Sequence, residues 1–600
     1  MREIVAPELG GKRSALPALV GPLLVAASLF IMLLWTWLKW PDPLTDFGRE
    51  LYLAWQVSEG KTLYRDVEHF NGPLSVHFNA LLFHCFSPTL QTLAYANIII
   101  AIATVAILYS LIRQVGGPAA ATACGVTFTT LFVCAQFVDT GNFNFITPYS
   151  HEVTHGLLLA LVAIACCIKA IETRKLIFAA ATGALLGLLW LTKLEIFLAA
   201  AVAVGAGILL RPSTDARHPL PAAPQKLLAI TAGAMLLVVA VAFLLLLIPL
   251  PPGTALRGVL GGAFYIFDSQ LTSLPFYRRI AGFDSPAINM GHMTASAIVI
   301  ALLLLVQPVF RRNNTVKSPV ALAILAVAIP PAGAWAVGPD FPWHMALRGL
   351  PLVLAGLLAH HIYLQRRHLQ TPSATAWTML LVFSFVLLAK ILLATQLQHY
   401  GFALAMPAVM VVATVLVGRP IFPSPVAARD SSAWRWFGLS VVATFIVVHL
   451  IVYSHHFASK PVQVASGANA FFASAGLPGQ PSRGDSLAAL LDRFASIVPA
   501  DATLAAVPEG AMINFLTRRP NPTPFITLQP PEYLMFGSKR ITQAYIDAPP
   551  DFVVINLAVD PAEYGSRGFD VDYGKALADW IKQNYAERAR FGRLILLSRR

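Results

Sequence analysis

Apolar runs of nearly 20 residues recur along the first three quarters of the chain, separated by short polar segments. A helix of this length crosses the hydrocarbon core of a bilayer. We expect spans at about 16–40, 91–112, 118–137, 154–172, 176–192, 194–210, 227–250, 292–310, 318–337, 345–364, 375–395, 402–418 and 436–456. The pattern predicts a polytopic α-helical membrane protein with about 13 spans.

The first long polar segment, residues 41–79, follows the first span and is rich in acidic and aromatic side chains. We interpret it as the first outer loop of a membrane enzyme. Residues Pro73–Ser87 are apolar but interrupted by polar side chains, which predicts a helix lying in the outer interface. The aromatic segment 251–291 is expected to lie there too.

The composition changes after the last span, because residues 457–600 are polar and Pro-rich. Strand-like runs are expected at Thr503–Val507, Pro524–Leu528, Phe552–Asn556 and Leu594–Leu597, and helices near 485–497, 509–517, 538–547 and 574–586. This alternation predicts a small C-terminal α/β domain. We therefore divide the chain into a membrane domain, 1–456, and a second domain, 457–600.

Composition and charge agree with this division. The chain is 56% hydrophobic and 12% charged, whereas soluble domains are about a quarter charged. With the N-terminus inside, 18 Lys and Arg residues fall in inner segments and 7 in outer loops. We expect a plasma (inner) membrane protein with a cytoplasmic N-terminus and an extracytoplasmic C-terminal domain. The net charge of +13 follows this orientation, so no nucleic-acid partner is expected.

Asp46 and Glu50 are the first candidates for catalysis. They are four residues apart in a segment of helical character, so both side chains would share one face. A carboxylate at the membrane edge can act as a general base or hold a divalent metal ion. The alternative is a solvated interfacial helix in which Arg49 pairs with these acids. The pattern identifies no cofactor and leaves a divalent metal open.

Two basic residues stand in apolar surroundings at the outer ends of spans. Placing the charge of Lys193 in apolar surroundings costs free energy unless the side chain snorkels to the interface or binds an anion such as a phosphate. The alternative is a turn lysine paired with Glu195. Arg348 poses the same choice, and His399 and Tyr400 belong to a further polar cluster at the outer end of a span.

The segment His151-Glu152-Val153-Thr154-His155 matches H-E-x-x-H, which on a helix places two imidazoles on one face for zinc. A third ligand is lacking nearby, since Glu172 would lie about 25 Å from His155 along the helix. An intramembrane zinc protease remains an alternative. Glu152 could instead be a second acid facing Asp46 across one cavity.

The pattern Asp46-Phe-Gly-Arg-Glu50, Gly60-Lys-Thr-Leu-Tyr64-Arg-Asp66 and Gly72-Pro73-Leu74 resembles the GT-C glycosyltransferases. The likeness is to the branch of protein O-mannosyltransferases and lipid A aminoarabinose transferases. It includes the Thr192-Lys193 turn and His399-Tyr400-Gly401 and covers roughly the first 420 residues. Relatives often carry His or Lys before a Pro-Pro-Leu step, where this chain has Phe70-Asn71-Gly72-Pro73-Leu74.

The resemblance implies an inverting transfer of a sugar from a polyprenyl-phosphate donor to an extracytoplasmic glycolipid, polysaccharide or protein. It implies Asp46 as base, with Glu50 and Glu152 as further catalytic acids. Lys193 and Arg348 would bind the donor phosphate, with Asp66, His399 and Tyr400 also contacting substrate. A lipid or sugar transporter is the remaining alternative, although we find no internal repeat of the kind that transporters often show.

Overall fold

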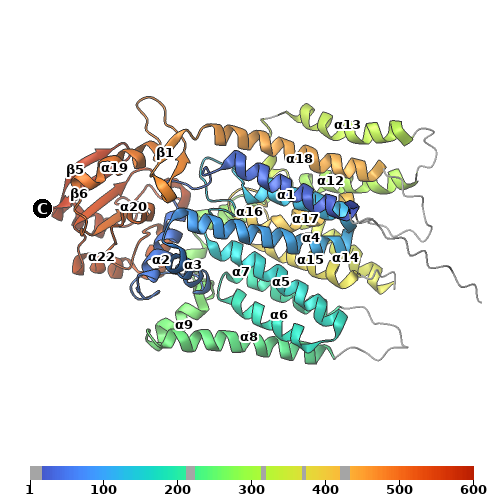
Figure 1. Cartoon of the computed structure of the whole chain (residues 1–600), viewed down its shortest axis with the longest axis horizontal. Coiled ribbons are helices and arrows are strands. Elements are labelled where there is room, and N and C mark those ends of the chain that lie inside the picture. Colours follow the sequence, from blue (N-terminus) through green and yellow to red (C-terminus); the bar gives the residue numbers. More distant parts are fainter. Residues whose placement is uncertain (1–15, 211–222, 313–318, 339, 368–372, 419–432) are drawn as a thin grey trace, which may run out of the picture.

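The computed structural model describes residues 16–210, 223–312, 319–338, 340–367, 373–418 and 433–600. Long helices form a bundle, and the C-terminal domain lies against one end of it (Figure 1). We call this the domain end. Several basic residues assigned to inner segments, among them Arg2, Lys12, Arg211 and Arg419, lie outside the described residues.

The bundle is built from apolar helices. They are α1 (Leu16–Thr36), α4 (Leu90–Phe128), α5 (His151–Thr173), α6 (Leu176–Trp190), α7 (Leu194–Leu209), α8 (Pro224–Leu247), α12 (Pro286–Arg312), α13 (Pro319–Val337), α14 (Leu350–Arg366), α15 (Ala374–Leu387), α17 (Met406–Val417) and α18 (Ala433–Ala458). In the described part of the chain, 8 helical segments are long and apolar enough to cross a membrane, and further apolar helices are shorter. The count of about 13 spans stays a prediction.

Helix α4 contains two antiparallel passes, as the sequence pattern predicts for 91–112 and 118–137. Gly117 interrupts it with φ +81°, a left-handed conformation that glycine adopts without steric cost. The Tyr109 hydroxyl lies 3.4 Å from the Thr122 hydroxyl. In a straight helix these residues would be about 20 Å apart along the axis, so the chain must fold back between them. A π-helix, η1 (Thr129–Val133), follows.

Short helices occupy the segments at the domain end, where α2, α3 and α9 are seen in Figure 1. They are α2 (Phe47–Ser58), α3 (Leu74–Phe86), α9 (Pro252–Leu260), η2 (Gly261–Tyr265), α10 (Ser269–Thr272), α11 (Pro275–Ala281), η3 (Trp343–Met345), η4 (Leu388–Ile391) and α16 (Gly401–Leu404). Helix α3 confirms the short helix expected at 73–87. The pair α6 and α7 confirms that residues 176–210 form two helices with Lys193 at the turn.

The C-terminal domain has a four-stranded sheet in the order β3-β4-β6-β5, in which β3 and β4 are parallel and the other pairs antiparallel. The strands are β3 (Leu504–Val507), β4 (Phe552–Asn556), β5 (Tyr585–Phe591) and β6 (Leu594–Arg599), with a separate pair β1 (Val462–Val464) and β2 (Phe471–Ala473). The helices are α19 (Arg483–Ile497), α20 (Ala511–Thr517), α21 (Pro530–Phe536), α22 (Ser538–Asp547) and α23 (Lys575–Asn584), with 3₁₀ turns η5 (Gly467–Asn469) and η6 (Pro561–Tyr564).

The predicted strand at 524–528 is wrong. This segment is an irregular loop, in which Leu528 N–H bonds to Pro508 O at 2.7 Å and Pro524 O accepts from Glu68 N–H. Its apolar side chains are buried in the domain core without strand pairing. Strand β5 was missed because its exposed positions are charged and its alternation is weak.

The C-terminal domain and the segment 41–79 share one hydrophobic core. Buried Phe47 and Leu51 of α2 belong to the same cluster as Met512 and Phe515 of α20. The approach is close, since a Cβ on Gly48 would lie 2.3 Å from Met512 N. The start of α2 is therefore placed by residues more than 400 positions later in the chain.

Candidate functional site

Asp46 lies in the segment 41–79, immediately before α2 (Phe47–Ser58). It precedes the helix with φ +52°, and its backbone N–H donates to Glu509 Oε1 at 2.9 Å. Its side chain does not cap the helix and is 25% exposed, with Arg49 Nη1 3.9 Å away. The C-terminal domain thus holds the backbone and leaves the carboxylate accessible.

Two cavities meet at this carboxylate. The lysine cavity, about 520 Å³, is lined by Asp46, Arg49, Lys193, Lys390 and Glu532 together with aromatic and apolar side chains. The arginine cavity, about 570 Å³, is lined by Arg279, Arg348 and Arg483 with several acids and amides. Asp46 and Ile280 line both. A group in either cavity could therefore reach Asp46.

Lys193 lines the lysine cavity at the turn between α6 and α7. It is 8% exposed, its Nζ lies 3.4 Å from Ser150 Oγ, and it stands 5.6 Å from the centre of the Tyr149 ring. Glu195 forms its ion pair with Lys390, at 2.7 Å, and not with Lys193. Glu195 also acts on Lys193 through its charge, so Lys193 and Lys390 share this carboxylate.

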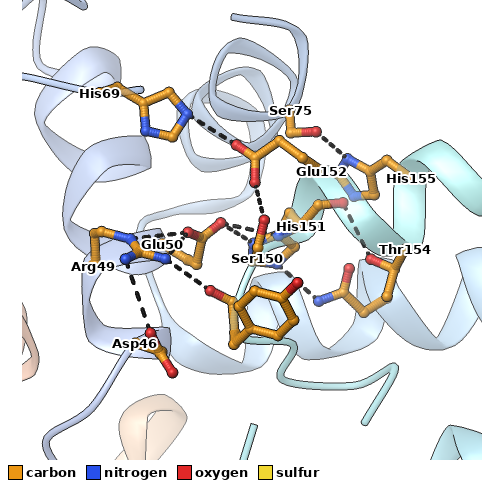
Figure 2. Close-up of polar contacts among 12 residues, drawn as sticks. Asp46, Arg49, Glu50, His69, Ser75, Ser150, His151, Glu152, Thr154 and His155 are labelled. Atoms are coloured by element: carbon orange, nitrogen blue, oxygen red, sulfur yellow. Dashed lines mark hydrogen bonds and ion pairs between the residues drawn. The ribbon is translucent and has the colours of Figure 1, made fainter. Parts of the chain in front are cut away.

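Glu50 and Glu152 are buried, and neither lines the two cavities. Figure 2 shows their polar contacts with the neighbouring side chains. Glu50 Oε2 accepts from the backbone N–H of His151 at 3.1 Å and lies 3.0 Å from its Nδ1. Glu152 Oε1 lies 3.0 Å from His69 Nε2, and its Oε2 accepts from Ser150 Oγ at 2.5 Å. Glu152 thus reaches Lys193 through Ser150 and does not face Asp46 across a cavity.

The two histidines of the H-E-x-x-H segment do not form a metal pair. Both ring nitrogens of His151 are engaged, with Nδ1 at Glu50 and Nε2 3.0 Å from Asn97 Nδ2. His155 Nδ1 lies 3.1 Å from Ser75 Oγ. Across the described ranges no group of three or more His, Cys, Asp or Glu side chains could hold a metal ion. These described residues therefore do not form the three-ligand zinc site of a metalloprotease.

The remaining predicted residues separate into three places. Arg348 and His399 line the arginine cavity, while Tyr400 lines the lysine cavity. Arg348 is thus not beside Lys193, and its Nη1 donates to Asn289 Oδ1 at 3.1 Å. Asp66 closes a turn by accepting from Thr62 N–H at 2.8 Å and pairs with Arg65. It lines neither cavity.

The sequence reasoning missed the carboxylates that the C-terminal domain brings to the site. Glu532 lines the lysine cavity, Asp560 and Glu563 line the arginine cavity, and Glu509 contacts the backbone of Asp46. Burial raises the pKa of Glu532 to about 7, and burial with repulsion from Glu509 raises that of Glu563 to about 7. The same two causes raise the pKa of Asp46 well above its usual 3.8. One signal was available for Glu509, which follows a predicted strand at its carboxyl end, where α/β sites lie.

No protein-family model matches the chain, and no curated protein sequence does. Among solved structures, the apo oligosaccharyltransferase of Archaeoglobus fulgidus is 13% identical, with a TM-score of 0.49 over 95% of this chain and 72% of that chain. ArnT from Cupriavidus metallidurans is 14% identical, with a TM-score of 0.43 over 98% of both chains in the apo state. It is also known bound to undecaprenyl phosphate, with a TM-score of 0.41. Both neighbours are GT-C membrane glycosyltransferases, the family that the sequence resembles.

Proposed function

We propose that this chain is a membrane glycosyltransferase that moves a sugar from a lipid-phosphate donor to an acceptor on the domain end of the bundle. The observation that carries the proposal is the position of Asp46, a partly exposed carboxylate where the lysine and arginine cavities meet. One cavity would hold the donor and the other the acceptor, so that a single base reaches the reacting atoms of both.

The lysine cavity suits the donor. Lys193 and Arg49 supply positive charge for a phosphate. Leu198 and Ile266 line the same cavity and are exposed, at 43% and 45%. A polyprenyl chain could leave the cavity over these apolar side chains toward the bilayer while its phosphate stays at the cations.

The reaction follows from these positions. An acceptor hydroxyl in the arginine cavity gives its proton to Asp46, and its oxygen forms a bond to the anomeric carbon of the sugar. The bond between that carbon and the phosphate oxygen breaks, and its electron pair stays on the phosphate. Lys193 and Arg49 stabilise the charge that develops there. Attack from the face opposite the phosphate inverts the anomeric configuration.

The positive-inside bias supports an extracytoplasmic reaction in the plasma membrane, because it assigns the domain end to the outside. The proposed acceptor is a glycolipid, a polysaccharide or a protein, the three classes that the sequence resemblance implies.

The experiment compares polyprenyl-phosphate sugars in cells carrying the wild type, a deletion and Asp46→Asn. We expect one such lipid to accumulate equally in the deletion and the variant, because Asn cannot accept the proton. Purified Asp46→Asn should transfer that sugar about 100-fold or more slowly than the wild type. Asp492→Asn, on the exposed face of α19, is the control and should behave as the wild type. Near-normal transfer by Asp46→Asn would overturn the assignment of the base.

A further inference from the structure

One carboxylate of the lysine cavity has an oxygen without a partner. Glu532 lies on α21 of the C-terminal domain and is 7% exposed. Its Oε2 is buried and has no hydrogen-bond partner among the described residues. Buried polar atoms are nearly always satisfied, so an unpaired carboxylate oxygen in the wall of a cavity indicates that a ligand supplies the donor.

The position of Glu532 within the cavity limits what that ligand group can be. Lys193 and Lys390 lie on the bundle side, on α6–α7 and η4, whereas Glu532 comes from the C-terminal domain. Glu532 repels a phosphate, which belongs at the cations. Asp46 lines the cavity together with both groups. In the proposed reaction the phosphate and the base act on the same anomeric carbon, so the sugar lies in this cavity beside both groups, and its hydroxyls are hydrogen-bond donors.

We propose that Glu532 recognises the sugar of the donor by accepting a hydrogen bond from a ring hydroxyl. This rests on the proposed function, because it assumes a sugar-phosphate lipid in the lysine cavity. The rings of Tyr149, Tyr400 and Phe70 line the same space and give the sugar an aromatic wall, as is common where a few polar groups fix a ligand's orientation.

The structure connects this group to the base. Gln529, the residue before α21, donates from Nε2 to Glu509 Oε2 at 3.2 Å. Glu509 Oε1 in turn accepts the N–H of Asp46 at 2.9 Å. Helix α21 also packs on α10, which covers the cavity from the 251–291 segment. The hydrogen bonds fix the register between the sugar-binding carboxylate and the base.

The test separates the sugar from the phosphate. Full-length protein in nanodiscs is titrated with undecaprenyl phosphate and with undecaprenyl phosphates carrying glucose, mannose, N-acetylglucosamine or arabinose. For the sugar lipid that the wild type binds best, we expect Glu532→Ala to weaken binding roughly 10-fold or more, and Glu532→Gln less, since Gln keeps an acceptor oxygen. Both variants should bind undecaprenyl phosphate at least as tightly as the wild type, because they remove a negative charge from the cavity.

Two controls complete the design. Lys193→Ala should weaken both lipids, because each carries the phosphate. Glu587→Gln, on exposed positions of β5, should change neither. Retained binding of undecaprenyl phosphate shows that the Glu532 variants are folded.

Equal binding of the sugar lipid by wild type and Glu532→Ala overturns the inference, and so does a parallel loss of both lipids. If the wild type binds none of these lipids, the proposed function itself fails, which is a different result.

Discussion

Asp46 is a carboxylate whose ionisation is opposed by burial and by the charge of Glu509. It must be ionised to act as a base, so kcat/KM should increase with pH. The midpoint of this acid limb of the pH–rate profile should lie well above 3.8, the usual pKa of an aspartate. Glu509→Gln keeps an oxygen that can accept the Asp46 N–H and removes the charge. The pKa of Asp46 then falls, and we expect the acid limb of the pH–rate profile to move to lower pH. An unmoved limb would contradict this electrostatic role of Glu509.

Glu532 also affects stability. Its folded-state pKa of about 7 lies above the usual 4.5 of a glutamate, so the folded protein holds the proton more tightly than the unfolded chain. This contribution is complete below pH 4.5 and is lost as the pH rises through 7. Glu532→Gln, which cannot ionise, should therefore be more stable than the wild type at pH 8, by up to about 3 kcal/mol, and similar to it at pH 4.5. Thermal unfolding in detergent at the two pH values checks this, and an equal difference at both would contradict it.

At the scale of elements, the turn between α6 and α7 is held by the segment 41–79. Gly72 N–H donates to Thr192 O at 3.2 Å, and Leu74 N–H donates to Leu191 O at 3.1 Å. A Cβ on Gly72 would lie 2.2 Å from Leu191 O, so no side chain fits there without moving the turn that carries Lys193.

Gly72→Ala should accordingly raise the KM for the donor and lower Tm, since the turn and Lys193 must shift together. Gly253→Ala on α9 is the matched control, because a Cβ there meets nothing within 4 Å. The measurement is donor-dependent kinetics together with thermal unfolding. An unchanged KM in Gly72→Ala would show that the turn does not set the position of Lys193.

At the scale of the whole molecule, Glu68 joins three parts of the chain. It lies in the segment 41–79 with a side chain that is 1% exposed, and it pairs with Arg257 of α9 at 3.0 Å and with Arg540 of α22. The segment 41–79, the 251–291 segment and the C-terminal domain thus meet at one carboxylate.

Glu68→Gln should loosen this junction, because a neutral amide cannot balance both guanidinium groups. We expect the free energy of unfolding to fall by about 1–3 kcal/mol. The effect is limited because Arg540 is 50% exposed and solvent screens its charge. Faster hydrogen exchange in both α9 and α22 would confirm the effect, with Glu587→Gln as the unchanged control. Faster exchange in only one of the two helices would contradict a shared junction.

Much of the fold was predictable because hydropathy is local. The two passes of α4, the α6–α7 pair and the helix at 73–87 follow from apolar runs and from Gly117-Pro118. The irregular conformation of residues 524–528 could not be predicted, because their apolar alternation is typical of a strand. Only packing in the folded domain leaves this segment unpaired.

For the proposed site, the sequence by itself pointed to Lys193, because a charged side chain within an apolar run is costly. It pointed to Asp46 through its helical spacing from Glu50 and through the resemblance to the GT-C glycosyltransferases. It could not tell which acids face a cavity. Glu50 and Glu152 are prominent in the sequence yet buried in hydrogen bonds, while Glu532 lies on the cavity wall. Only the tertiary structure decided this, because the contact that fixes Asp46 comes from Glu509, 463 residues away, and no local pattern encodes such a pairing.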